Sequence, residues 1–211
     1  MSIALAFAAA GSDGLVSISA DGWEFTAEEG TAWVDSLELG LAPGEVCSDD
    51  PVLAESLGAF FHPRCQGGRT LRIEGPWVVD LLTGRFDPAL EGLSLPEVAL
   101  AEVSVKLKAP GPRPALEVLG LVGEREFELA LKGAIPAKFS GGEPVLIDES
   151  LGRLVLDLDF EGWFGELEVE GCVESQGRPG TPVDFSGPGC EPVEQELRNQ
   201  LVRGNLRSQP R

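Results

Sequence analysis

The stretch EVSVKLK, Glu102–Lys108, decides the predicted fold, because apolar and polar residues alternate along it without a break. Successive side chains of a β-strand point to opposite faces, so this stretch has one apolar and one polar face. The same alternation recurs at Glu126–Lys132 and at Leu154–Glu161. A strand with one polar face is typical of antiparallel sheets. We expect the lysines of the first stretch to face Glu126 and Glu128 on a neighbouring strand.

Further strands are predicted over Thr31–Leu41 and over the apolar run Ile3–Ala10. The second run could also be read as a signal peptide, although no basic segment precedes it. The chain has 27 glycines and 16 prolines, which divide it into short segments. This spacing suggests an antiparallel sandwich or barrel. We predict a single β-sandwich domain over residues 1–205 and a loose basic tail over residues 206–211. From Arg198 onward the chain has four arginines and no acid.

Two short helices are expected. The first is Pro51–Phe61, with Asp49 or Asp50 as its N-cap and a proline at its first position. The second begins after Cys190, with Pro192 in its first turn. Its predicted buried face consists of apolar residues at helical spacing: Val193, Leu197, Leu201 and Val202.

Four cysteines form two pairs with the same separation, each bracketing a polar loop. Three connectivities are open to four cysteines. We predict the local one, Cys47–Cys65 and Cys172–Cys190, which places the protein in an exported compartment: periplasm, cell surface or extracellular space. The alternative is four reduced, buried thiols in a cytosolic protein.

The chain is strongly acidic, with a formal net charge of -19 over 211 residues. Such a surface repels phosphate backbones and anionic lipid, so we expect neither a nucleic-acid partner nor a membrane partner. No run approaches the length of a membrane span. We expect the protein to be a monomer. Its expected partner is a protein, a glycan or a cation. Four tryptophans could form a sugar-stacking platform, but core positions suit their apolar neighbours better.

The stretch GPWVVDLLTG, Gly75–Gly84, places a carboxylate, Asp80, among apolar residues. Trp77, Val79 and Leu81 are expected to point to one face of the strand, and Val78, Asp80 and Leu82 to the other. Burying an ionised carboxylate is costly unless it is hydrogen-bonded. We therefore expect Asp80 to accept backbone N–H groups of the turn that follows, rather than to act in catalysis.

Catalysis is not expected, and no cofactor is predicted. His62 is the only histidine, and neither a Gly-x-Ser-x-Gly elbow nor a phosphate-binding glycine loop is present. Thirty-five acids leave a carboxylate-dependent hydrolase as an alternative. Calcium is the other alternative, since oxygen ligands suit a hard cation. The candidate ligands, which also fit a solvated acidic face, are Asp49, Asp50, Asp157, Asp159 and Glu161.

Three segments carry a resemblance: DGWEFTAEEGTAWVDSLEL (21–39), GPWVVDLLTG (75–84) and LSLPEVALAEVSVKL (93–107). Their order resembles exported bacterial lipoprotein sandwiches of the transthyretin-like or carboxypeptidase-regulatory-like type. The resemblance spans residues 1–108 and implies an exported sandwich. Some distant members are periplasmic copper-associated proteins, but no ligand set carries over, since Met1 and His62 are the only softer side chains besides cysteine. The lipid-modified N-terminal cysteine of such proteins is absent here, which trimming of the chain would explain. We expect a non-catalytic binding or structural protein.

Overall fold

The computed structural model describes residues 2–9, 16–20, 22–47, 64–89, 93–94, 97–148, 151–158, 167–177, 181–201 and 203–210. Strands make up 58% of the structure and helices 11%, so the mainly-β prediction is confirmed. The finer prediction of a two-sheet sandwich is not confirmed. The described strands belong to one mixed, 14-stranded sheet.

The elements follow one another along the chain as fourteen strands and two described helices. The strands are β1 (Ser2–Ala9), β2 (Val16–Ala20), β3 (Trp23–Leu41), β4 (Arg64–Gln66), β5 (Thr70–Asp80), β6 (Arg85–Asp87), β7 (Leu93–Ser94), β8 (Val98–Leu107), β9 (Leu116–Val122), β10 (Arg125–Leu131), β11 (Ile135–Ile147), β12 (Leu151–Leu158), β13 (Val183–Asp184) and β14 (Arg203–Pro210). The helices are α3 (Glu170–Ser175) and α4 (Glu191–Gln200). Among the described residues, neither helix is long and apolar enough to cross a bilayer.

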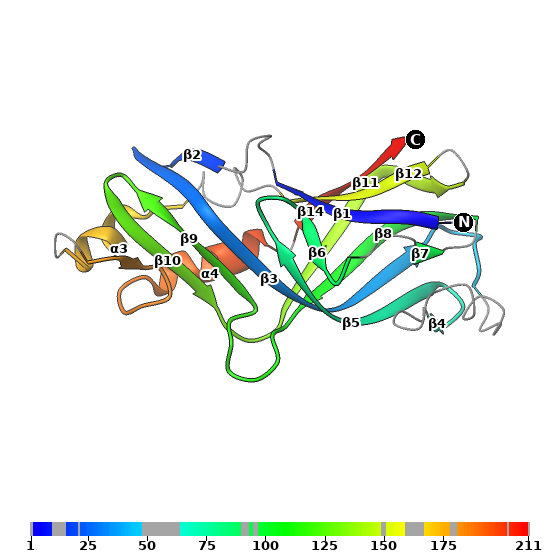
Figure 1. Cartoon of the computed structure of the whole chain (residues 1–211), viewed down its shortest axis with the longest axis horizontal. Coiled ribbons are helices and arrows are strands. Elements are labelled where there is room, and N and C mark those ends of the chain that lie inside the picture. Colours follow the sequence, from blue (N-terminus) through cyan, green and yellow to red (C-terminus); the bar gives the residue numbers. More distant parts are fainter. Residues whose placement is uncertain are drawn as a thin grey trace.

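The 19-residue strand β3 connects two parts of the sheet (Figure 1). Its first half pairs with β2 and β9, and its second half pairs with β5 and β8. Beyond β9 lie β10 and β13, and beyond β8 lie β11, β14, β12, β1 and β7. Two bulges, between Ala27 and Glu29 and between Val34 and Ser36, interrupt the register of β3 along its length, and a third irregularity lies at its end, between Gly40 and Leu41. Bulges bend a strand and increase its twist, so one strand can serve both parts.

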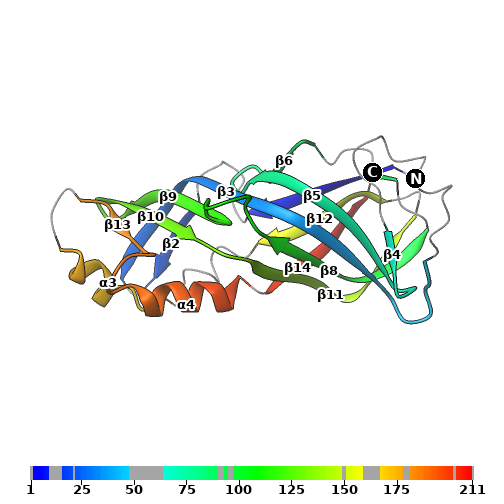
Figure 2. The ribbon, with the colours of Figure 1, turned by 90° about the horizontal axis from the view of Figure 1, so that it is seen from below.

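The sheet curls around its apolar face. Strands β5 and β6 lie off the main strand order, because β5 pairs with β3 and β6 pairs with β5. They approach the end of the sheet that contains β1, where Cα atoms of β6 and β1 come within 8 Å of each other. Trp77, Leu37 and Ile73 are fully buried in the contiguous apolar core. Burial of such side chains is the main stabilising term of the fold. The two helices lie along one side of the β9–β10 part of the sheet (Figure 2).

The alternation predicted for β8 and β10 is observed as alternating burial. In β12 the alternation fails at Val155, which is buried like both of its neighbours. This strand pairs in parallel with the apolar strand β1, and strands in parallel pairs are commonly buried on both faces. Parallel pairing also joins β10 to β13 and β11 to β14, so the sheet is not purely antiparallel. The strand predicted over Ile3–Ala10 is confirmed as β1.

The predicted contact between the lysines of β8 and Glu126 or Glu128 is wrong, because β9 and β3 separate β8 from β10. Lys106 instead pairs with Asp35 of β3, at 2.9 Å. Further ion pairs on these central strands join Lys138 to Glu102 and Arg72 to Glu38 and Glu74. The hydrogen bond from Arg72 to Glu74 raises the pKa of Arg72 above its ordinary value.

The C-terminal helix is confirmed. It is α4, with Pro192 in its first turn and with Val193, Leu197 and Leu201 buried. The loose tail predicted over residues 206–211 is wrong for residues 206–210, which belong to β14. This strand pairs with β12, and its Leu206 is buried. The helix predicted over Pro51–Phe61 lies outside the described residues, and the six-residue helix α3 was not predicted.

Candidate binding site

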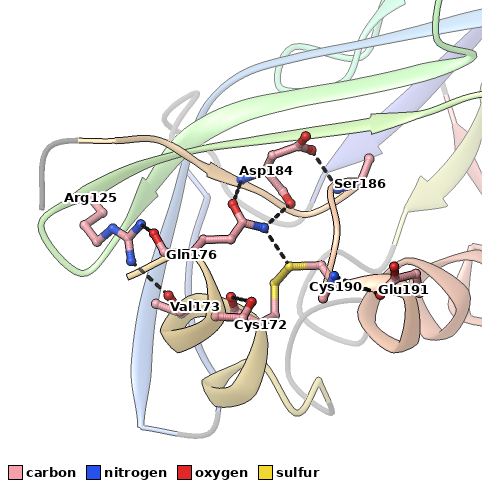
Figure 3. The surroundings of a disulfide bond; sticks show 10 residues. Arg125, Cys172, Val173, Gln176, Asp184, Ser186, Cys190 and Glu191 are labelled. Atoms are coloured by element: carbon pink, nitrogen blue, oxygen red, sulfur yellow. Dashed lines mark hydrogen bonds between the residues drawn. A yellow bond between two sulfur atoms is a disulfide. The ribbon is translucent and has the colours of Figure 1, made fainter. Parts of the chain in front are cut away.

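Both disulfides form with the predicted local connectivity. Cys47 joins Cys65 near β4, and Cys172 joins Cys190, each over a sequence separation of 18. The described residues contain no free cysteine. The second bridge connects α3 to the residue directly before α4, so it sets the relation between the two helices (Figure 3).

The Gln176 side chain forms hydrogen bonds with Asp184 and Cys190, in the segment between the two helices (Figure 3). Its Oε1 accepts the Asp184 N–H at 2.8 Å, and its Nε2 donates to the Asp184 carbonyl at 2.7 Å. The same Nε2 donates to Cys190 Sγ at 3.0 Å. One amide group thus links the end of α3, strand β13 and the disulfide.

Arg125, the first residue of β10, holds the other side of the same unit. Its Nη1 donates to the Val173 carbonyl at 3.0 Å, and its Nη2 donates to the carbonyls of Gln176 and Thr181 at 2.9 and 3.2 Å. The last carbonyls of a helix have no partner within the helix, and a cation at this end also interacts favourably with the helix dipole. Arg125 therefore fixes α3 against the sheet.

Aromatic packing joins β13 and its surroundings to the core. Phe185 lies 5.5 Å from Phe127 and 5.9 Å from Phe25, measured between ring centroids. Ser186 Oγ bonds both the N–H and the carbonyl of Ala130 at 3.0 Å, so a side chain continues the pairing at the β10 edge. The segment that follows α3 is therefore attached to the sheet by apolar and polar contacts.

A hollow of about 700 Å³ lies between the two helices, and we call it the helical hollow. Its apolar wall includes Leu167, Pro192, Val193 and the half-cystine Cys172, and Glu168, Glu170 and Glu196 bring carboxylates to it. Glu168 and Glu170 are exposed. The Glu196 carboxylate accepts Gln200 Nε2 at 2.8 Å, which holds it in place.

The electrostatics of the helical hollow favour a cation. The N-terminal end of α4 carries a partial positive charge, but Glu191 and Glu194 in its first turn offset it. Glu191 also accepts the Gly189 N–H at 2.9 Å. Within the described part of the chain, no three acidic, histidine or cysteine side chains converge closely enough to hold a metal ion. We call Glu168, Glu170 and Glu196 the rim glutamates, and their negative charge suits a basic organic group.

The side chains of the candidate calcium ligands all lie outside the described part of the structure. Asp49, Asp50, Asp159 and Glu161 lie outside the described residues, as does His62. Asp157 lies in β12, but its side chain is likewise not described. Calcium therefore stays a prediction.

Asp80 has the predicted structural role. It ends β5, and its Oδ1 accepts the N–H groups of Leu82 and Thr83 at 2.9 and 3.0 Å. Trp77 and Val79 are buried on the other face of β5, and Leu81, which follows the strand, is buried too. The carboxylate itself is exposed, so the cost of burying it does not arise.

The tryptophans do not share one environment. Trp77 is fully buried, which confirms its core position. Trp33 is half-buried, and the Arg113 guanidinium lies 5.2 Å above its ring in a cation–π contact. Trp163 lies outside the described residues.

No family model, curated protein or solved structure matches this chain. The resemblance to transthyretin-like sandwiches is therefore untested and stays a prediction. Sequence reasoning missed Gln176, Arg125 and the glutamates of the helical hollow. The signal that pointed to this region was the cysteine pair, because its cross-link over 18 positions joins α3 to the residue directly before α4.

Proposed function

We propose that this chain is an exported, monomeric, non-catalytic binding protein whose ligand presents a basic group to the helical hollow. The observation that carries the proposal is the position of this hollow: it lies between two helices tied by Cys172–Cys190, with Glu168, Glu170 and Glu196 at its rim.

Export is supported by the two disulfides. Structural disulfides persist in oxidising compartments and are rare in the cytosol, where thiols are kept reduced. Cys172 is 3% exposed and Cys190 is fully buried, so this bridge is sheltered from soluble reductants. It therefore serves as a structural cross-link in the proposal.

Binding is supported by the rigidity of the walls. The disulfide, the Gln176 amide and the Arg125 guanidinium hold the two helices and the intervening segment in one arrangement. A site that is already ordered loses less conformational entropy when a ligand binds. The apolar wall, which includes Val193 and Pro192, suits the alkyl stem of a lysine or arginine side chain, while the rim carboxylates suit its charged head.

The alternatives from the sequence, a calcium-binding protein and a carboxylate-dependent hydrolase, gain no support from the described residues. A glycosidase of the usual kind needs two carboxyl groups facing each other across the scissile bond. At the helical hollow, Glu196 is engaged by Gln200, and Glu168 and Glu170 are exposed to solvent.

A labelled triarginine peptide tests the proposal by fluorescence anisotropy. The double variant Glu168→Gln/Glu196→Gln removes two rim charges with little change of shape. We expect it to weaken binding about tenfold, which corresponds to about 1.4 kcal/mol.

The matched control is Glu28→Gln/Glu29→Gln, which removes two exposed charges from β3. A chain of net charge -19 attracts any polycation over long range, and the control measures this general effect. Equal weakening in both double variants would show that the peptide senses only the overall charge, and the helical hollow would lose its role.

A further inference from the structure

Strands β11 and β14 form a fork. They pair in parallel only where Lys138–Ser140 meets Arg203–Asn205. After this point β11 continues with β8, and β14 continues with β12. Each of the two strands is then paired along one edge only. Among the described residues, no strand pairs with the other edge of β11 beyond Ser140 or with the other edge of β14 beyond Asn205. We call this divergence, with its two open edges, the strand fork.

The sequence of β11 explains where the fork begins. The register between β11 and β8 breaks between Ser140 and Val145, so the segment Gly-Gly-Glu-Pro between them bulges out of the ladder. Gly141 lies so close to β14 that a Cβ atom on it would be 3.2 Å from the Leu206 carbonyl oxygen. The two strands are therefore still close together at Gly141. Pro144 has no N–H to offer to a neighbouring strand, which is typical of an open edge.

A hollow of about 660 Å³ occupies the fork. Val145, Leu151 and Leu206 are buried beneath it, while Leu146 is 57% exposed at its side. Leu146 is one of two large apolar residues that are strongly exposed in the described structure. The fork thus combines open backbone edges with an accessible apolar side chain.

We propose that the strand fork binds an extended, basic segment of a partner protein, which adds to the sheet as a further strand. Open edges present N–H and C=O groups at strand spacing, and an extended backbone is the chemical group that matches them. The hollow beside Leu146 would hold an apolar side chain of the segment, since alternate side chains of an added strand point to the same face. The bound core would be about five residues long, the length of the shorter edge, Leu206–Pro210.

Charge selects the occupant. Glu143, which is exposed, and Asp148 bring carboxylates to the fork. The whole chain carries a net charge of -19, so a second copy is repelled and a basic segment is attracted. This inference is independent of the helical hollow, because the two surfaces share no residue.

The probe for this inference is a labelled peptide of alternating lysine and valine. We expect it to bind and to slow amide hydrogen exchange in residues 141–147 or 206–210, as a newly paired edge requires. A second peptide of the same sequence carries N-methyl groups on alternate backbone nitrogens, so it keeps the charge and side chains but loses donors. We expect no binding of this second peptide. Equal binding of both peptides, or binding without slowed exchange in either edge, would overturn the proposal.

Leu146→Ser tests the apolar contact, and we expect about tenfold weaker binding, in line with the loss of one apolar anchor. Val46→Ser is its matched control, because Val46 is 73% exposed and does not line the fork. The variant Glu168→Gln/Glu196→Gln should bind the lysine–valine peptide as the parent protein does, so failure at the helical hollow is distinguishable from failure here. Absence of binding by the unmodified peptide would show that the bulge and Pro144 serve only to protect this edge from pairing.

Discussion

A Cβ atom on Gly120 would lie 2.0 Å from the carbonyl oxygen of Thr26. Gly120 is in the middle of β9, opposite Ala27, at the first bulge of β3. The second bulge has the same arrangement, because a Cβ atom on Gly75 of β5 would lie 2.5 Å from the Val34 carbonyl oxygen. At both places the backbone of β3 comes close to a glycine of the neighbouring strand, which has no side chain. The two glycines therefore allow the bends that carry β3 through both parts of the sheet.

Gly120→Ala should destabilise the protein strongly. The added methyl group meets backbone, which cannot move aside as a side chain can, so the cost should reach the upper part of the range for overpacking, about 3 kcal/mol. Urea denaturation followed by tryptophan fluorescence measures it. Gly142→Ala is the control, because nothing lies within 4 Å of a Cβ atom there, and it should change the free energy of unfolding little. Equal stability of the two variants would show that β9 shifts freely and that the bend needs no glycine.

Asp80→Ala should lower the free energy of unfolding by about 1 kcal/mol, the usual contribution of such hydrogen bonds. Its Oδ1 accepts two turn amides, and alanine leaves both to water. Asp80→Asn should cost less, since the amide oxygen can still accept. Thermal and chemical denaturation of both variants at neutral pH measure the difference. An alanine variant as stable as the parent protein would show that the turn through Thr83 forms without this carboxylate.

The two disulfides should differ in their resistance to reduction. Cys172 and Cys190 are buried, whereas Cys47 and Cys65 are only partly buried. A thiolate must reach a sulfur atom to reduce the bond, so limited reductant should open Cys47–Cys65 first. Alkylation followed by peptide mass spectrometry identifies the free thiols at each step. Earlier alkylation of Cys172 or Cys190 would mean that the helical unit opens more readily than its burial implies.

Arg125→Ala should cost about 1–3 kcal/mol, because it leaves carbonyl groups at the end of α3 without a donor. Arg125→Lys should retain only part of the stabilisation that Arg125 provides, since a lysine cannot donate to several carbonyls in a fork geometry. Arg72→Ala is the matched control. It loses ion pairs with Glu38 and Glu74 on a partly exposed face, where such pairs contribute about 0–1 kcal/mol. Comparable losses in Arg125→Ala and Arg72→Ala would contradict the anchoring role of Arg125.

The sequence predicted those features that depend on local pattern. The alternation in β8 and β10, the buried face of α4 and the Asp80 turn each follow from residues close together in the chain. Pairing between distant segments could not be predicted from such local patterns. The basic residues at the end of the chain looked like a solvated tail, yet they form β14, which pairs with β12 and, through its first residues, with β11.

The candidate site was less predictable than the fold. Equal cysteine spacing marked the region, but the contacts that shape it join residues far apart in sequence: Arg125 bonds Val173 across 48 positions. The helix α3 is only six residues long and has no capping side chain, so it lacks the usual signals of a helix start. The glutamates of the helical hollow were indistinguishable from the many other acids until the disulfide brought the two helices together.

Nuclear magnetic resonance mapping of the bound triarginine peptide shows whether the peptide lies in the helical hollow. In a titration of isotope-labelled protein, we expect the perturbed amides to cluster in residues 167–172 and 189–196, around the walls of the hollow. In Glu168→Gln/Glu196→Gln the same cluster should need about tenfold more peptide to reach the same perturbation, whereas Glu28→Gln/Glu29→Gln should titrate nearly as the parent protein does. Perturbations scattered over the acidic surface, with no preference for these two segments, would show that the helical hollow is not the binding site.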